Sequence, residues 1–286
     1  MAAATTPERA VLGGLEVSLI RDSVYWWDGG AMFGVVPKTL WSRHTTADEL
    51  NRIPVAFNSY LVRTGEHTVL IDTGGGDKMD ARARERMKLP PESDPLPEVI
   101  ARHGIDPESI DIVINSHLHW DHSGGNTILR AGVAEPAFPR ARYFASRPEW
   151  EHAHERLARD RVAYIDANYD PLVDSGRMTL VEPDCEIVPG VWMRRAPGHT
   201  RDMCVVNAES GGQTFCFLSD LAPFAAQLTP TWIPAFDLYP LESIETKQRV
   251  LAEAIEQNWL VGFAHDTELA FARLAWRKSL PVAVPL

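Results

Sequence analysis

The densest group of potential metal ligands lies in residues 116–122, Ser-His-Leu-His-Trp-Asp-His, which contain the pattern H-x-H-x-D-H. Imidazole and carboxylate are the ligand types that suit zinc and neighbouring divalent metals. Side chains two apart on a strand project to the same side, so His117 and His119 could hold one ion. Asp121 and His122 would then face a second ion. A polar surface loop is the alternative, but the whole chain has only ten histidines, so this clustering favours a metal site.

Three further candidate ligands stand directly after apolar runs in the second half of the chain. His199 follows a glycine that permits a tight turn, Asp220 follows residues 214–219, and His265 follows residues 260–264. An unpaired carboxylate at the end of an apolar strand would be costly to bury, and a metal partner would explain Asp220. Each residue alone is more typical of hydrogen-bonded structure. Their shared position predicts that the ligands gather at one edge of the sheets, where loops host functional groups.

The elements that must position these residues are mainly strands. Alternating or continuous apolar runs predict strands at Leu15–Ile20, Val55–Val62, Thr68–Asp72, Ile110–Ser116, Arg142–Ala145, Met178–Glu182, Val191–Arg195, Met203–Ala208 and Thr214–Ser219. Helices are predicted at Leu96–His103, Pro148–Ala158 and Ile244–Asn258. We therefore expect an α+β fold, a four-layer αββα sandwich in one domain spanning residues 1–286. Surface loops or lids are expected at Leu89–Pro97 and Pro223–Pro240.

Composition narrows the functional classes. The chain has 28 basic and 39 acidic residues, a formal net charge of −11, and no basic stripe that could follow a phosphate backbone. Nucleic acid is therefore not expected as a partner. The first residues do not resemble an export signal, and no run of eighteen apolar residues suggests membrane insertion. The three cysteines are odd in number and lie in expected strands, which favours buried thiols and a cytoplasmic location.

The order H-x-H-x-D-H, Gly-His, Ser-Asp and a late His resembles the metallo-β-lactamase superfamily of metal-dependent hydrolases, over most of the chain. Residues 58–62 (Asn-Ser-Tyr-Leu-Val) and 70–74 (Leu-Ile-Asp-Thr-Gly) match its early paired strands. The resemblance implies one metal on His117, His119 and His199, another on Asp121, His122 and His265, and a bridge at Asp220. It also implies that Asp72 orients a ligating imidazole and raises its basicity. Asp72 could instead be a turn residue before Gly74–Gly76.

This ligand set implies two divalent ions. Zinc is the expected metal, although iron, manganese or cobalt suit the same nitrogen and oxygen ligands. Two ions that share a carboxylate and a solvent molecule lower the pKa of that solvent and give hydroxide near neutral pH, so hydrolysis is the expected reaction. Asp121 and Asp220 are the expected catalytic residues. Asp121 would move a proton to the leaving oxygen, or it would serve only as a ligand.

The segments 28–38, 220–223 and 232–240 are similar to a branch that includes quorum-quenching lactonases. This similarity makes an N-acyl homoserine lactone the leading substrate, opened by metal-bound hydroxide. An apolar trough for the acyl chain could come from aromatic and methionine side chains near the metals, although these could equally be core or loop anchors. The candidates are Tyr25, Trp26, Trp27, Met32, Phe33, Trp232 and Phe236.

Two departures from the lactonase pattern concern the residues after the ligands. The best-known homoserine lactonases place a tyrosine three residues after the bridging aspartate to hydrogen-bond the substrate carbonyl, whereas this chain has Pro223. Tyr239 or another donor would have to substitute, or the metals act alone. After His199 the chain continues Thr-Arg-Asp-Met, where many relatives have a second Gly-His. The surroundings of this ligand are therefore expected to differ.

Other functions remain open at this point. The main alternative is an organophosphate triesterase or another esterase, because the same centre performs phosphoryl chemistry. An exported antibiotic β-lactamase lacks support without a signal peptide, and a glyoxalase II-like thioesterase lacks a basic cluster for glutathione. A non-hydrolytic di-metal redox protein of the flavodiiron type would need a further flavin domain. The expected partner is a small molecule with an apolar acyl or aryl part, without membrane binding; members of this branch are often dimers, which implies that the chain can form a homodimer.

Overall fold

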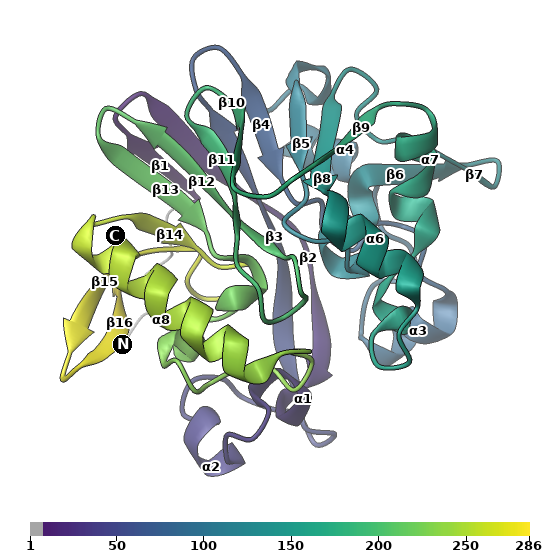
Figure 1. The fold of residues 1–286 in the computed structure, drawn as a ribbon. Coiled ribbons are helices and arrows are strands. Elements are labelled where there is room, and N and C mark those ends of the chain that lie inside the picture. Colours follow the sequence, from purple (N-terminus) through teal and green to yellow (C-terminus); the bar gives the residue numbers. More distant parts are fainter. Residues whose placement is uncertain (1–7) are drawn as a thin grey trace.

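Two seven-stranded sheets form the centre of the computed structural model, which describes residues 8–286 (Figure 1). The first sheet has the order β1 (Arg9–Leu12), β2 (Leu15–Asp28), β3 (Arg52–Arg63), β4 (Thr68–Ile71), β5 (Ile112–Ile114), β8 (Arg142–Ser146) and β9 (Met178–Val181). The second has the order β10 (Cys185–Val188), β11 (Val191–Arg195), β12 (Cys204–Ser210), β13 (Gln213–Phe217), β14 (Leu260–Gly262), β15 (Phe271–Arg277) and β16 (Leu280–Pro285). A separate hairpin joins β6 (Thr127–Arg130) to β7 (Val133–Pro136).

The helices are mostly short and lie outside the sheets. They are α1 (Gly29–Phe33), α2 (Lys38–Trp41), α3 (Ala81–Arg86), α4 (Leu96–Arg102), α5 (Trp120–Ser123), α6 (Arg147–Glu155), α7 (Asp170–Asp174) and α8 (Pro240–Glu256). Single 3₁₀ turns occur at Pro107–Ser109, Gly124–Asn126, Arg161–Ala163, Asp166–Asn168, Ser219–Leu221 and Ala225–Leu228. None of the helices within residues 8–286 is long and apolar enough to cross a membrane.

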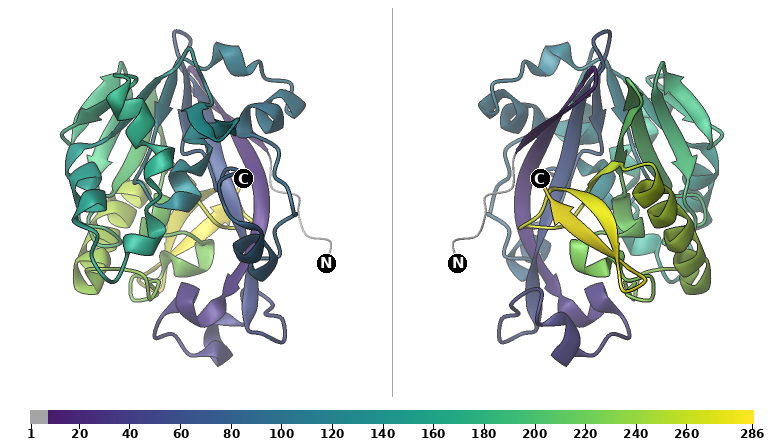
Figure 2. Two further views of the ribbon diagram at one scale, coloured as in Figure 1. Left: turned by 90° about the vertical axis from the view of Figure 1, so that its right-hand side faces the viewer. Right: turned by 90° about the vertical axis from the view of Figure 1, so that its left-hand side faces the viewer.

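Apolar side chains from the inner faces of both sheets form the central core. Alternation along β2 and β3 sends Val17 and Tyr60 inward, where they join Met193 and Phe217 of the second sheet. The outer face of the first sheet packs against α4, α6 and α7 in a second cluster. The outer face of the second sheet packs against α8 in a third cluster, and Figure 2 shows the helices on the outside of the paired sheets. The expected αββα sandwich is confirmed.

The expected strands and helices all have counterparts, with shifted ends. The largest extension is β2, which continues beyond Ile20 to Asp28 through an irregularity between Arg21 and Val24. Strands β1, β10, β15 and β16 and the β6–β7 hairpin were not predicted. Strands β1, β6, β7 and β10 have only four residues each, and the burial patterns of β15 and β16 lack a clean alternation.

The segment 223–240 differs from the surface loop that the sequence suggested. It contains a 3₁₀ turn, and several of its side chains are buried. The buried Lys247 of α8 holds it by donating hydrogen bonds to the carbonyl oxygens of Gln227 (3.1 Å) and Trp232 (2.9 Å). The Gln227 side chain in turn donates to the carbonyl oxygen of Met32 at 2.7 Å. These bonds hold the segment against α8 and the Met32 backbone, so it packs on the body of the protein.

Candidate metal centre

The loop after β5 presents four of the candidate ligands. His117 lies in a bend after β5, His119 has extended backbone just before α5, and the first turn of α5 then brings Asp121 and His122 alongside them. Asp72, at the end of the neighbouring parallel strand β4, accepts hydrogen bonds from the backbone N–H and the hydroxyl of Ser116, both at 2.7 Å. Asp72 has a left-handed backbone (φ 56°), which costs about 1–3 kcal/mol and persists only where surrounding contacts fix it.

Three of the candidate imidazoles are each held through Nδ1. His122 Nδ1 lies 2.7 Å from Asp72 Oδ2, and His199 Nδ1 lies 2.9 Å from Asp237 Oδ1. His265 Nδ1 lies 2.8 Å from the carbonyl oxygen of Ala56. Such partners fix the tautomer and the ring orientation, and they leave each Nε2 atom available to bind a metal ion. Asp72 therefore contacts a candidate ligand in the way the resemblance implied.

The turn before His199 depends on a glycine in close contact with α8. Gly198 has φ 142°, and an added Cβ would lie 2.4 Å from the Cα atom of Ser243. A larger residue would therefore push this turn away from the helix. The glycine before His199, which the sequence suggested as a tight-turn residue, allows His199 to reach the cluster.

The seven candidate ligands gather into overlapping groups. His117, His119 and His199 place ligand atoms within 4.8 Å of one another, and Asp121, His122 and His265 do the same. Asp220 lies between the two groups. Its Oδ2 atom is 3.2 Å from His199 Nε2, whereas its Oδ1 atom is 3.1 Å from His265 Nε2 and 3.4 Å from His122 Nε2. Each carboxylate oxygen thus faces a different set of imidazoles.

Unpaired polar atoms inside this cluster fit bound cations. Within residues 8–286, the buried Nε2 atoms of His117, His119 and His122 and the Oδ1 atom of Asp220 have no hydrogen-bond partner. A buried polar atom without a partner costs about 1–3 kcal/mol. Histidine nitrogens and carboxylate oxygens are ligands for zinc and similar metals, so this donor set fits divalent cations.

The electrostatics of the cluster divide its imidazoles. Burial opposes the charged forms of His122 and His199, but the Asp220 carboxylate beside them raises their pKa values. Burial, together with the neighbouring imidazoles, holds the pKa values of His117 and His119 well below the usual range, which keeps these rings in the neutral form that binds metals. Burial opposes the charged form of Asp220, but His122, His265 and His199 hold its pKa well below the usual value. Asp220 therefore remains a carboxylate that requires positive partners.

A cavity of about 650 Å³ opens onto the cluster. His119, Asp121, His199, Asp220 and His265 form part of its lining. Much of the remaining wall is apolar or aromatic and comes from segments far apart in the sequence, including Tyr25, Trp27, Met32, Met87, Trp120, Pro234 and Phe236. The cavity has the size and the mixed lining of a small-molecule site.

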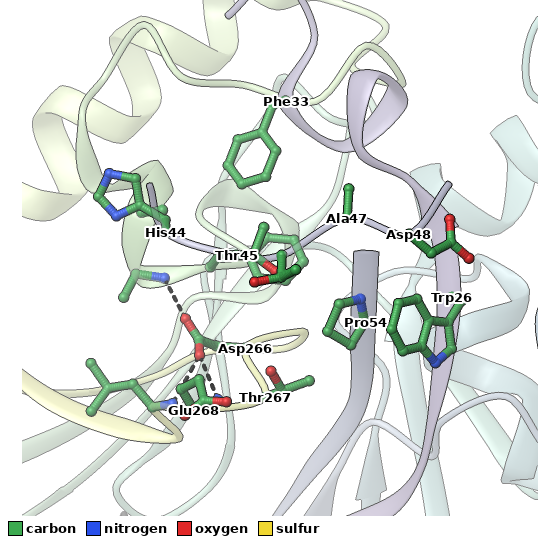
Figure 3. A pocket seen from close by; sticks show the side chains of 15 residues that line it. Trp26, Phe33, His44, Thr45, Ala47, Asp48, Pro54, Asp266, Thr267 and Glu268 are labelled. Atoms are coloured by element: carbon green, nitrogen blue, oxygen red, sulfur yellow. Dashed lines mark hydrogen bonds between the residues drawn. The ribbon is translucent and has the colours of Figure 1, made fainter. Parts of the chain in front are cut away.

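The expected substrate-binding residues do not all reach this cavity. Met32 and Phe236 line it. Trp26 and Phe33 instead line a neighbouring cavity of about 650 Å³ (Figure 3). Successive residues of β2 point to opposite faces, so Tyr25 and Trp27 face the metal cluster while Trp26 faces away.

Trp232 and Tyr239 line neither cavity. The Trp232 ring packs edge-on against Phe33 and His44. The Tyr239 hydroxyl accepts a hydrogen bond from Arg201 at 3.3 Å, which holds it away from the cluster. The suggestion that Tyr239 replaces the missing tyrosine donor is therefore wrong, because Arg201 holds its hydroxyl, the carbonyl oxygen of Gly198 holds its backbone N–H (2.9 Å), and its side chain does not line the cavity.

Asp266 separates the neighbouring cavity from His265, and sequence analysis did not single it out. Figure 3 shows its carboxylate accepting backbone hydrogen bonds. They come from Ala225 (3.0 Å), Glu268 (2.9 Å) and Leu269 (2.8 Å). These bonds fix the turn after His265 and tie it to the segment 223–240. An aspartate directly after a ligand at a strand end was the one local signal that could have revealed this role.

Tyr25 is the phenol that the structure brings to the cluster. Its hydroxyl donates a hydrogen bond to Asp121 Oδ2 at 3.2 Å, and its ring stacks on Phe57 with 4.5 Å between ring centres. Burial, followed by the charges of Asp121 and Asp220, holds the Tyr25 pKa well above the usual value. Tyr25 is therefore a neutral, fixed hydrogen-bond donor in the cavity lining.

Comparison with known proteins agrees with this geometry. The profile of the Metallo-beta-lactamase superfamily matches residues 53–257. Curated relatives include an N-acyl homoserine lactonase from Bacillus sp, 26% identical over 78% of this chain and 85% of the relative. Another is the N-acyl homoserine lactonase AiiB from Agrobacterium fabrum, 28% identical over 78% of this chain and 83% of the relative.

Solved structures give the same assignment. A probable metal-dependent hydrolase from Staphylococcus aureus superposes with a TM-score of 0.85 at 30% identity, covering 92% of this chain and 94% of the other. A dizinc quorum-quenching lactonase in complex with a product shares the fold, with a TM-score of 0.80 at 18% identity over 99% of this chain and 98% of the other. The family match, the shared fold and the clustered candidate ligands agree: the chain belongs to the metallo-β-lactamase superfamily of metal-dependent hydrolases.

Proposed function

We propose that this hydrolase is a dinuclear lactonase that opens N-acyl homoserine lactones or related lactones. The position of Asp220 carries the proposal, because its two oxygens face two separate groups of imidazoles at the floor of an apolar-walled cavity. One ion would be held by His117, His119 and His199. The other would be held by Asp121, His122 and His265. Asp220 would contact both.

The metal and the side chains would divide the chemistry. Two divalent cations, with zinc expected, would supply Lewis acidity and a water acidified enough to attack near neutral pH. Asp121, which lies at the cavity lining beside His265, would carry a proton to the ring oxygen as the lactone C–O bond breaks. Tyr25 would turn its single O–H proton from Asp121 to the carbonyl oxygen of the bound substrate, as negative charge develops there. It would thus perform the role for which Pro223 is unsuited.

The cavity wall supports an acyl-lactone as the substrate class. Trp27, Met32 and Phe236 offer apolar surface next to the ligand cluster, where an acyl chain could replace water. Curated relatives are N-acyl homoserine lactonases, and one solved neighbour holds N-hexanoyl-L-homoserine at its catalytic metal centre. The substrate would therefore be a small molecule with an apolar chain and a hydrolysable ring ester.

A substrate panel tests this proposal. We expect proton release with homoserine lactones of short and long acyl chains, and a larger kcat/KM for chains that reach Phe236. The Phe236→Ala variant should lose this preference, because it removes apolar contact area worth about 25 cal/mol per Å². Paraoxon-like triesters serve as the comparison. Turnover of triesters without turnover of any lactone would show that the alternative, an organophosphate triesterase, is correct.

The Tyr25→Phe variant tests the hydrogen-bond donor. It keeps the ring on Phe57 but removes one hydroxyl, so we expect kcat for lactones to fall about 10- to 100-fold, the value of a hydrogen bond to a charged group. KM and metal content should stay near wild type. Tyr169→Phe is a matched control, because the Tyr169 hydroxyl also donates to a carboxylate, that of Asp166 at 3.1 Å, outside the cavity. Equal kcat values in the two variants would exclude Tyr25 as the donor.

A further inference from the structure

Glu149 is a fully buried carboxylate that the ligand set does not include. It lies in the first turn of α6, where its backbone N–H donates to the hydroxyl of Ser146, the residue before the helix, at 3.3 Å. Its Oε1 atom accepts hydrogen bonds from the backbone N–H of Leu118 (3.2 Å) and from the Tyr164 hydroxyl (2.9 Å). Its Oε2 atom accepts one from the Thr200 hydroxyl at 2.6 Å.

Two of these donors belong to the segments that carry the first group of candidate ligands, and the third contacts one of those ligands. Leu118 lies between His117 and His119, and Thr200 directly follows His199. Tyr164 packs its ring against the His119 ring, with 4.8 Å between centres, and pairs with it through an isolated backbone bridge. One carboxylate therefore joins two ligand loops that come from different sheets.

The cost of this arrangement suggests a role in geometry rather than in stability. Burial raises the pKa of Glu149, and the three hydrogen bonds oppose that rise. A buried charge contributes little net stability, because well-packed apolar side chains often replace it without loss. What the carboxylate does supply is a fixed spacing between three donors, and a spacing error below 1 Å matters for ligands around a small ion.

We propose that Glu149 is a positioning residue for the metal centre, which fixes the 116–122 loop and the His199 turn at the spacing where three imidazoles meet one ion. The proposal rests on the ligand set of the proposed function but not on the identity of its substrate. It also explains why Thr200 can follow His199 in place of the second Gly-His of many relatives: its hydroxyl ties the turn to α6.

Conservative and disruptive variants of Glu149 separate spacing from charge. In Glu149→Gln, the amide oxygen can still accept from Leu118 and Tyr164, while the amide NH₂ group can donate to Thr200. Metal affinity should therefore stay near wild type. Glu149→Met leaves all three donors without an acceptor, and we expect its metal affinity to fall about 10- to 100-fold.

The Thr200→Val variant isolates the bond between the two loops. It removes only the contact to the His199 turn and leaves those to Leu118 and Tyr164, so its loss of affinity should be smaller. The Glu149→Met/Thr200→Val double variant should lose no more than Glu149→Met alone, because both changes remove the same bond. Additive losses of metal affinity would contradict a shared Glu149–Thr200 hydrogen bond that joins the two ligand loops.

Thermal unfolding with and without added zinc distinguishes positioning from plain stabilisation. A ligand that binds only the folded chain raises Tm according to its affinity, so weaker binding shrinks the zinc-induced rise. We expect the zinc-induced rise to be smaller in Glu149→Met and Thr200→Val than in wild type. These variants should also lose their metal to a chelator that is too weak to remove it from wild type. A merely structural role would lower Tm equally with and without zinc.

Two controls accompany these variants. Glu151→Gln changes an exposed glutamate on the same helix and should match wild type. Val17→Ala weakens the central core far from the ligand loops and should lower Tm without changing the zinc-induced rise.

A wild-type rise and wild-type metal retention in Glu149→Met would overturn the proposal, as would equal losses in Glu149→Gln and Glu149→Met. If the protein binds metal but opens no lactone, the proposed substrate is wrong. The comparison of metal affinity among the Glu149 variants still tests the positioning role.

Discussion

The Asp121→Asn variant is expected to lower kcat for a lactone by about 10²- to 10⁴-fold, the usual contribution of a group that transfers a proton. Asp121 Oδ2 lies 3.7 Å from His265 Nε2 and accepts the Tyr25 hydrogen bond, so the carboxylate faces both the ligand cluster and the cavity. Asparagine keeps a carbonyl oxygen that can ligate and accept from Tyr25. It cannot carry a proton to the leaving oxygen.

The leaving group provides the control for this variant. A lactone ring oxygen leaves as a basic alkoxide and needs a proton, whereas nitrophenolate leaves an ester without one. The loss in Asp121→Asn should therefore be large for lactones and small for a nitrophenyl ester, with metal content close to that of wild type. If turnover of both substrates falls in proportion to metal content, Asp121 serves as a ligand only.

Local sequence patterns were sufficient to predict the ligand cluster. His117 to His122 are neighbours in the chain, and His199, Asp220 and His265 each follow an apolar strand. Because such strands end at a common edge of the sandwich, the sequence could predict that these side chains meet. The same apolar runs predicted the paired sheets, but not the strands β1, β10, β15 and β16 at or beside their edges. The fold and the ligand cluster were thus accessible without knowledge of tertiary contacts.

The residues that support the ligands were not accessible in this way. Asp237 lies 38 residues from His199, Glu149 lies 51 residues from Thr200, and Tyr25 lies 96 residues from Asp121. No periodicity or motif links these partners, because their contacts arise only when separate loops pack together. Asp237 also lies in a segment that looked like a surface loop.

The walls of the cavity show a similar division. The alternation of β2 could have separated Trp26 from Trp27, because neighbouring strand residues face opposite sides. The place of Trp232 depends on the buried Lys247, which binds its carbonyl oxygen and whose pKa burial lowers to about 8. A lysine is rarely buried, so nothing in the sequence indicated this anchor.

The dinuclear centre is tested most directly by counting metal ions per chain while lactone hydrolysis is followed through chelation and zinc re-addition. We expect about two divalent ions per chain, loss of hydrolysis in step with their removal, and recovery when zinc returns, because no serine or cysteine of residues 8–286 lines the cavity. Hydrolysis that persists at the same rate in the metal-free chain would contradict a metal-dependent mechanism.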